Sequence, residues 1–182
     1  MSTFLTVLAV VLAVLVGLWL WWTAHRLDRM HHRIELARTS LDVQLQRRSG
    51  AVLELVALAG SGNLDRASAL LLHEAAHEAR AADHATMESA ESNLSEVLRA
   101  VLPDAEDVAF LREDPDVSRV VDDLAGDCRK VELARRFHND VVVSARALRS
   151  RRRVRWLRLA GHAAELATVD LDDEPPAALR AD

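Results

Sequence analysis

The sequence predicts an all-α protein, in which an N-terminal transmembrane helix continues into an antiparallel bundle of about four helices, some of them long. Three observations predict this: an uncharged apolar run near the start, apolar residues three and four positions apart beyond it, and few turn-forming residues. Half of the 182 residues are hydrophobic, and six Gly and four Pro are too few for the frequent turns of an all-β fold. Ala, Leu, Arg and Glu are abundant, and these residues lose little side-chain freedom in a helix.

Residues 4–22 form the uncharged apolar run, which we interpret as the membrane span. As a helix, its 19 residues would be about 28 Å long, which matches the hydrocarbon core of a bilayer. Trp19, Trp21 and Trp22 lie at its C-terminal end, where indole rings favour the membrane interface. A cleaved signal peptide is the alternative, but no basic residue precedes the run, and Trp22 occupies a position that requires a small residue.

The basic residues that flank this run predict its orientation. No basic side chain precedes it, whereas Arg26, Arg29 and Arg33 follow it closely. The positive-inside rule therefore predicts a single-pass protein of the plasma membrane, with a short external N-terminus and a cytoplasmic body. The lone Cys128 has no partner for an intramolecular disulfide, which fits such a reducing compartment.

Residues 23–160 are expected to form the helical body. Its first element is a long amphipathic helix that follows directly from the membrane span. Gly60-Ser61-Gly62 is expected to end this helix, and Asn63 is the expected N-cap of the next one. The helix carries its apolar stripe at Leu27, Met30, Ile34, Ala37, Leu41, Leu45, Val52, Leu55 and Val56.

Later elements follow from the same spacing. Helices are predicted over 64–80 and 83–101, and whether these two are continuous is left open. Residues 102–116 contain two prolines and an acidic excess, which predicts an irregular connection with at most one helical turn. The last long helix is predicted over 117–158, with Cys128 on its core-facing stripe. Residues 161–182 are acidic and contain two adjacent prolines, so a disordered tail is expected there.

Three stretches together resemble the LemA family. The first is 41–48 (LDVQLQRR), the second is 91–98 (ESNLSEVL), and the third is 131–142 (VELARRFHNDVV). The third is similar to the family's Ala-Arg-Arg-aromatic-X-Asn-Asp-Ala-Val pattern. The resemblance covers about residues 4–160. It implies a membrane protein with a short external N-terminus, a helical-bundle body and no established biochemical activity.

The sequence also departs from the pattern of this family. The Tyr-Asn pair usual just after the span is replaced by His25-Arg26, and a second such pair is lost at Ala145-Arg146. The tyrosine after the aromatic position is His138. If those tyrosines bind a ligand in relatives, this chain is expected to lack that ligand.

A group of polar residues lies on two helices that we expect to be neighbours. A carboxylate, guanidinium and amide network between these helices would set their register. An interaction site in the same place is the alternative. The group consists of Asp42, Arg135, Arg136, Asn139 and Asp140.

His73-Glu74-Ala75-Ala76-His77 spells H-E-x-x-H on a predicted helix. His73 and His77 would share one helix face and could bind zinc, with Glu74 as general base. A zinc hydrolase also needs a third ligand and an edge strand for its substrate; His84, Glu88 and Glu96 are the nearby ligand candidates, and no strand is evident. We therefore interpret the motif as an exposed helix face, and we expect no enzymatic activity and no cofactor.

A basic run near the end of the last long helix is the candidate lipid contact. Each of its charges would contribute about 1 kcal/mol near anionic headgroups. Pairing of these charges with the acidic residues of 104–127 or of the tail is an equal alternative. Nucleic acid is not expected, because stacking aromatics are scarce. The run contains Arg149, Arg151, Arg152, Arg153 and Arg155.

The functional prediction is a membrane-anchored, non-enzymatic scaffold protein. Its expected partners are membrane lipid, through residues 4–22, and a protein at the inner leaflet; homo-oligomerisation is left open. The alternatives are a membrane-bound zinc hydrolase that uses His73 and His77, and an anionic-lipid-binding protein. The sequence does not identify the protein partner.

Overall fold

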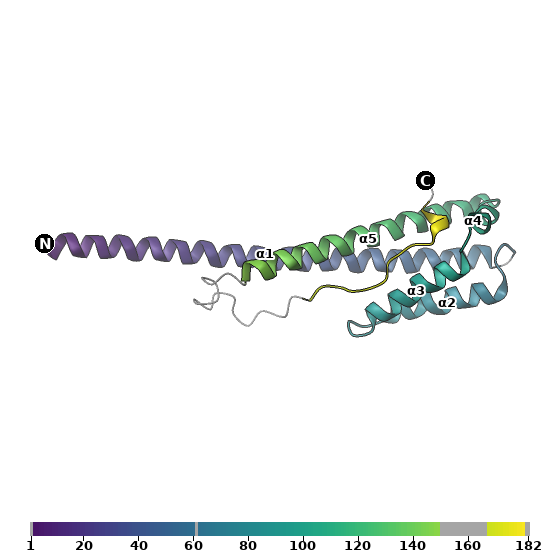
Figure 1. Cartoon of the computed structure of the whole chain (residues 1–182), viewed down its shortest axis with the longest axis horizontal. Helices are drawn as coiled ribbons and strands as arrows, with labels where there is room; N and C mark the ends of the chain where they lie inside the picture. The colour runs from purple at the N-terminus through teal and green to yellow at the C-terminus, as the bar shows by residue number, and fades with distance from the viewer. Residues whose placement is uncertain (1, 61, 150–166, 181–182) are drawn as a thin grey trace. The chain divides into compact units, whose positions relative to one another are not determined.

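The computed structural model describes residues 2–60, 62–149 and 167–180, and every regular element in these ranges is a helix, which confirms the all-α class. Two compact units are present: one is formed by the chain up to Ala37 together with residues from Asp140, and the larger one by Arg38–Asn139 together with residues from Val169. Figure 1 shows the elements α1 (Ser2–Ala59), α2 (Arg66–Ala81), α3 (Met87–Val101), α4 (Ala105–Leu111), α5 (Pro115–Arg149) and the 3₁₀ turn η1 (Ala177–Leu179).

α1 ends at Ala59, directly before Gly60, as the sequence Gly60-Ser61-Gly62 predicts. The N–H of Gly60 donates to the carbonyl of Val56 over 3.0 Å, and the N–H of Asn63 donates to the carbonyl of Ala59 over 2.9 Å. A Cβ atom on residue 60 would lie 2.5 Å from the carbonyl oxygen of Val56. Only glycine fits this close approach of the backbone, so Gly60 is a structural requirement of the turn.

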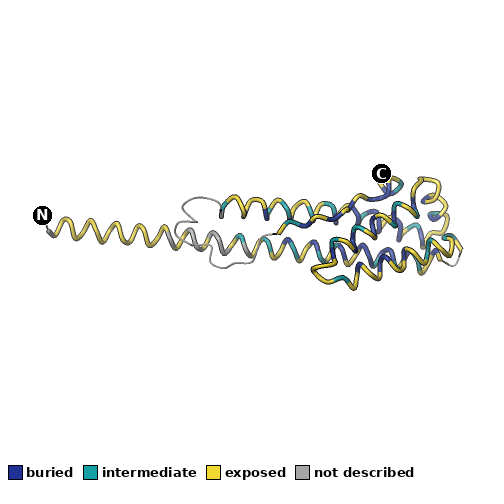
Figure 2. Tube along the Cα trace, turned by 60° about the horizontal axis from the view of Figure 1, so that its bottom comes forward, coloured by how far each residue is buried: buried dark blue, intermediate teal, exposed yellow. Residues whose placement is uncertain are grey.

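Residues 4–22 are helical, and the large apolar side chains described among them are exposed, from 38 % at Trp19 to 71 % at Phe4 (Figure 2). Of the three tryptophans at the end of this run, Trp21 stacks on the ring of His25, with centroids 5.5 Å apart and planes 8° from parallel. Within the described ranges, no helix combines the length and the mean hydropathy that a membrane crossing requires.

The start of α2 differs from the prediction by two residues. Asp65, and not Asn63, is its N-cap, because the Asp65 carboxylate accepts hydrogen bonds from the N–H groups of Ala67 (2.9 Å) and Ser68 (3.0 Å). α2 and α3 are separate helices that lie side by side (Figure 1). The turn between them is held by Asp83, whose carboxylate accepts from the N–H groups of Ala85 and Thr86.

The connection between α3 and α5 is more regular than predicted. Instead of an irregular stretch with at most one turn, it contains the seven-residue helix α4. Two apolar side chains of α4, Val108 and Leu111, are buried in the core, and the Asp107 carboxylate accepts the N–H of Asp104 over 3.3 Å. α5 then begins at Pro115, a first-turn position where proline costs no helix hydrogen bond.

The main core of the larger unit is an apolar cluster contributed by α1 to α5 and η1. Cys128 is buried there, as its place on the apolar stripe predicts, and burial raises the pKa of its thiol to about 11. The largest contributors are Leu55, Leu72, Leu94, Leu98, Leu102, Leu111, Leu124 and Leu179.

The smaller unit has its own apolar contact. Val142 and Ala145 of α5 are buried there, and Met30 and Ile34 of α1 pack against them. Ile34 and Met30 belong to the stripe that the sequence predicts for the first long helix.

The C-terminal segment corrects a prediction. Disorder was expected over 161–182, but residues 167–180 pack as an extended segment that ends in η1. Val169, Leu171 and Leu179 are buried in it. The physical reason is that Val169, Leu171, Asp172 and Asp173 have partners on the helices, described below. Residues 161–166 and 181–182 lie outside the described ranges.

Candidate functional site

The strongest candidate site is the surface of the larger unit that holds residues 169–174. Leu41 and Leu45 of α1, Met87 of α3 and Val131 of α5 form an apolar seat for this segment. The seat covers the side chains of Val169, which is 2 % exposed, and Leu171, which is 5 % exposed. We call this seat, together with the polar side chains around it, the tail site.

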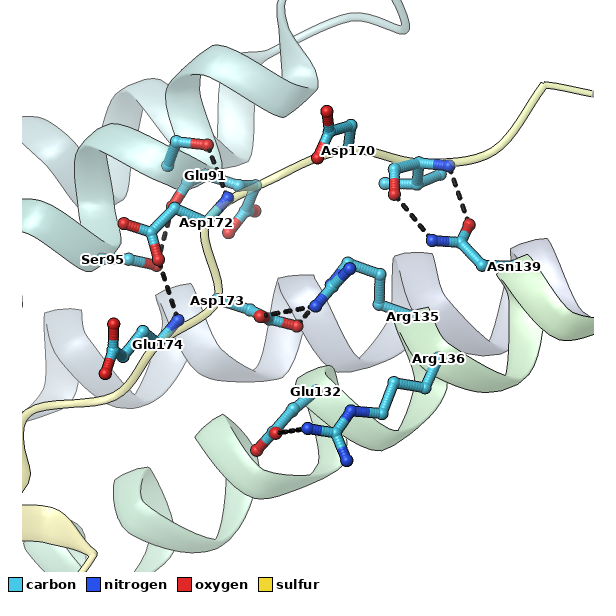
Figure 3. A network of polar contacts seen from close by, with 12 residues as sticks. Glu91, Ser95, Glu132, Arg135, Arg136, Asn139, Asp170, Asp172, Asp173 and Glu174 are labelled. Atoms are coloured by element: carbon cyan, nitrogen blue, oxygen red, sulfur yellow. Dashed lines mark hydrogen bonds and ion pairs between the residues drawn. The ribbon is translucent and has the colours of Figure 1, made fainter.

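The tail site holds the main chain of the segment through side chains of two helices. The Asn139 amide donates to the carbonyl of Val169 and accepts from its N–H, both over 2.9 Å (Figure 3). On α3, the Ser92 hydroxyl accepts from the N–H of Asp172 over 2.9 Å. Glu88, also on α3, accepts from the N–H of Asp170 over 3.2 Å. These contacts recognise an extended backbone whatever its side chains are.

Two arginines hold the acidic side chains of the segment. Arg135 on α5 makes a two-pronged contact with Asp173, with Nε to Oδ2 at 2.6 Å and Nη2 to Oδ1 at 2.9 Å (Figure 3). Arg99 on α3 contacts both carboxylate oxygens of Asp172, at 3.2 and 2.5 Å, and donates to the carbonyl of Glu174 over 2.7 Å.

These ion pairs shift the pKa values of Arg99, Arg135 and Asp172. The hydrogen bond from Arg99 lowers the pKa of the Asp172 carboxyl below its ordinary value. The hydrogen bonds to Asp172 and Asp173 raise the pKa values of Arg99 and Arg135, respectively. These shifts favour the charged forms of Arg99, Arg135 and Asp172, and the two arginines make the tail site electrostatically complementary to an acidic segment.

A buried ion pair joins α1 to α3 in the same unit. Arg48 Nη2 lies 2.5 Å from Glu91 Oε2, and Arg48 also donates to the Ser95 hydroxyl (2.9 Å) and to the Glu91 carbonyl (3.1 Å). Both side chains are almost fully buried, and burial raises the pKa of Glu91 against the opposing effect of Arg48. Within the described ranges, the Nε atom of Arg48 has no hydrogen-bond acceptor. The pair fixes how α1 and α3 meet beside the tail site.

The polar group predicted to set helix register does not form one network. Asp42 pairs with Arg38 on its own helix, at 3.1 Å, and Arg136 pairs with Glu132 on α5. Figure 3 shows Arg135 directed toward Asp173 and Arg136 toward Glu132. Arg135 and Asn139 therefore hold the chain's own C-terminal segment, while Asp42 takes no part in this contact.

The remaining member of that group, Asp140, is exposed and belongs to the smaller unit. Sequence reasoning did not single out Arg48, Ser92 or Arg99 as site residues. A signal for the buried pair existed, because Arg48 interrupts the apolar stripe of its helix at a core position. The alternation of apolar and acidic residues over 169–172 was the corresponding signal for an extended segment.

The H-E-x-x-H motif lies on an exposed face of α2. His73, Glu74 and His77 are all exposed, and the two imidazole centroids are 6.0 Å apart with their planes tilted by 52°. Of the proposed third ligands, Glu88 accepts the N–H of Asp170, and Nδ1 of His84 lies 3.5 Å from Arg38 Nη2. In the described part of the chain, no three His, Cys, Asp or Glu side chains are grouped so as to hold a metal ion.

The basic run proposed to contact lipid falls largely outside the described ranges. Arg149 is the last residue of α5. Arg151, Arg152, Arg153 and Arg155 lie in 150–166, which the structure does not describe.

Comparison with known proteins found no match to this chain among family models, curated proteins or solved structures.

Proposed function

We propose that this chain is a membrane-anchored, non-enzymatic interaction protein whose helical body binds an extended polypeptide segment. The observation that carries the proposal is the double hydrogen bond between the Asn139 amide and the main chain of Val169. A side chain that satisfies both polar groups of one residue in an extended segment acts as a receptor for backbone, not as part of a helix contact.

The anchor is proposed from residues 4–22. They contain no charged residue, and the large apolar side chains described among them are exposed. Exposed apolar surface on this scale needs a bilayer or another protein to cover it. Because Arg26 and Arg29 lie on one flank only, we propose that the body is on the cytoplasmic side of the plasma membrane.

We further propose that the chain is of the LemA type. The three stretches that carry this resemblance converge on the tail site or on the buried pair beside it. The stretch 41–48 supplies Leu41, Leu45 and Arg48; 91–98 supplies Glu91, Ser92 and Ser95; and 131–142 supplies Val131, Arg135 and Asn139.

The anchor is tested by membrane extraction of the full chain, with one cytoplasmic and one external reporter fused in turn after Asp182. We expect the chain to stay in the membrane fraction after salt and alkaline washes, and only the cytoplasmic reporter to be active. Recovery of the chain in the aqueous fraction would overturn the anchor, and activity of the external reporter would overturn the orientation.

The non-enzymatic assignment is tested by metal analysis of the purified full chain. We expect no stoichiometric zinc. One zinc per chain that is lost in His77→Ala, but kept in His84→Ala, would favour the zinc-hydrolase alternative over an interaction protein.

A further inference from the structure

We propose that the tail site is the docking site for an extended acidic segment of a partner protein, and that residues 169–174 of this chain occupy the site as an intramolecular competitor. The partner segment has an apolar residue at its first and third positions and acidic residues at its fourth and fifth. This inference rests on the proposed interaction function and names the class of partner. It does not depend on the membrane anchor.

Main-chain recognition makes the site open to other sequences. Asn139, Ser92 and Glu88 together bond three N–H groups and one carbonyl of the segment. Each of these bonds is made to backbone, so a partner segment in the same extended conformation would satisfy all of them. Peptide sites of this kind gain affinity from the main chain and specificity from alternate side chains.

The alternate side chains specify an acidic ligand. Val169 and Leu171 fill the apolar seat at the first and third positions, while the Asp170 side chain at the second position is exposed. Asp172 and Asp173 meet Arg99 and Arg135 at the fourth and fifth positions. Because Asp173 is only 7 % exposed, its carboxylate needs the paired arginine, and an uncharged residue there would leave Arg135 unpaired.

The segment is separable from the main core. Val169 and Leu171 pack in a cluster of their own with Leu41, Leu45, Met87 and Val131. The larger cluster, built on residues such as Leu55, Leu94 and Leu124, contains neither of them. Release of residues 169–174 therefore uncovers the small apolar seat and leaves the contacts of the main core in place.

Covalent attachment explains why the chain's own segment is the resident occupant. Seventeen residues, 150–166, separate α5 from residue 167. Because residues 169–174 belong to the same chain, their binding is intramolecular, and a partner segment has to compete with it. A partner must bind more tightly than the tail does, or must arrive when the tail has been released.

The test uses the full chain in detergent micelles with Leu171→Asp and Asp173→Lys, two changes that release the tail and leave the seat intact. The probe is a fluorescent peptide with the sequence of residues 169–180. We expect the peptide to bind this variant at least ten times more tightly than it binds the unaltered chain. Absence of binding, with helix content and thermal unfolding retained, would overturn the proposal.

Matched substitutions on neighbouring residues of α5 test specificity. In the tail-released variant, Arg135→Ala is expected to weaken peptide binding at least tenfold, and Arg136→Ala, which removes the same charge one residue away, is expected to leave it unchanged. The variant Arg135→Asp should bind a peptide carrying Asp173→Lys better than the original peptide. Equal loss in both alanine variants would mean non-specific charge attraction and would overturn the docking site.

Hydrogen exchange on the unaltered chain covers the case in which the released variant does not fold. The amides of Val169, Asp170 and Asp172 are expected to exchange through local release, faster than core amides of α3 and α5. Exchange of these three amides only with global unfolding would make the segment an integral element, and the proposal would fail. A dimer whose tail sites are filled by exchanged tails would also overturn it, because the occupant would be a second copy.

The same preparations separate this inference from the proposed function. If the chain resists alkaline extraction but does not bind the peptide, the docking-site proposal fails and the anchor proposal stands. If the chain binds the peptide but is extracted into the aqueous fraction, the anchor proposal fails and the docking-site proposal stands.

Discussion

The segments 4–22 and 169–179 are a contrasting pair, because the burial of each is the opposite of what its composition suggests. The first contains no charged residue, yet the large side chains described in it are exposed. The second is acidic and carries two prolines, yet Val169, Leu171 and Leu179 are buried. Burial in this chain therefore follows the presence of a matching surface and not the polarity of the segment itself. Hydropathy tells which side chains gain from leaving water, and only a partner surface decides whether they do.

The two segments differ in how their polar groups are hydrogen-bonded. In 169–174, main-chain N–H groups and two carboxylates have partners on α3 and α5, so the acidic segment can lie against protein. In 4–22, the helix satisfies its own backbone, and apolar side chains point outward on all sides. Such a segment suits a medium without hydrogen-bonding groups, which is the basis of the anchor proposal.

The largest expected effect comes from putting charge into the exposed apolar segment. Leu12→Arg with Val14→Arg is expected to move the chain out of the membrane fraction, because each arginine costs about 2.5–3.5 kcal/mol near the centre of a membrane helix. The measurement is fractionation with alkaline extraction. The control is Leu12→Ile with Val14→Leu, and equal membrane retention of the two double variants would contradict the anchor.

The buried ion pair beside the tail site gives the next effect. Glu91→Ala is expected to lower the free energy of unfolding by about 3–5 kcal/mol, because it leaves the Arg48 guanidinium buried without a carboxylate. Denaturant unfolding measures this change. The double variant Arg48→Met with Glu91→Leu should recover most of the loss, since two apolar side chains carry no unpaired charge. A loss below about 1 kcal/mol in Glu91→Ala would contradict burial of the pair.

Truncation of the apolar contact should loosen the C-terminal segment. Leu171→Ala is expected to weaken its packing by about 2 kcal/mol, the lower end for a buried leucine, because the seat is small. Hydrogen exchange at the Val169 amide measures the loss. Asp170→Ala, at an exposed neighbour, is the control and should change the protection by no more than about 0.5 kcal/mol.

Two adjacent arginines distinguish a contact with the tail from a contact within a helix. Arg135→Ala is expected to weaken docking of the tail by about 1.5 kcal/mol, because it strands the Asp173 carboxylate in a nearly buried position. Arg136→Ala removes only an exposed pair with Glu132 one turn away and is expected to cost about 0.3 kcal/mol. The measurement is again hydrogen exchange at the Val169 amide. Equal effects of the two alanine substitutions would contradict a contact of the tail with Arg135.

The smallest effect is a dependence on acid pH. Since the hydrogen bond from Arg99 lowers the folded-state pKa of Asp172 below its ordinary value of 3.8, ionised Asp172 stabilises the docked tail above that pH. This contribution is lost as the pH falls through the lowered pKa. The effect is small because the Asp172 side chain is 43 % exposed.

An NMR titration of the Asp172 amide measures this loss, and Asp172→Asn is expected to abolish it. A titration midpoint for Asp172 above its ordinary pKa would contradict the Arg99 contact.

The pH dependence that Glu91 contributes to stability has the opposite sign. Burial raises the pKa of Glu91, so its ionisation opposes folding as the pH rises from its ordinary pKa through the raised one.

Several elements of the fold were predictable because their signals are local. The end of α1 is encoded by Gly60, and the stripe through Leu41, Leu45 and Leu55 predicts its buried face. The position of Cys128 on the core face was predicted in the same way. The resemblance of 131–142 to a family pattern also drew attention to Arg135 and Asn139, but we expected them to form a network with Asp42 on a neighbouring helix. Their actual partners, Asp173 and Val169, are 38 and 30 residues away along the chain.

By itself, the sequence therefore determined the helical class, the ends of α1 and α3 and the apolar faces, since these depend on backbone propensity and on spacing within a few turns. Only the tertiary structure decided that Arg48 is paired in the core and that residues 169–174 are ordered. An acidic segment has no local reason to be buried. It becomes buried because three helices bring an apolar seat and two arginines to one place, where contacts between distant residues offset the cost of removing its charges from water.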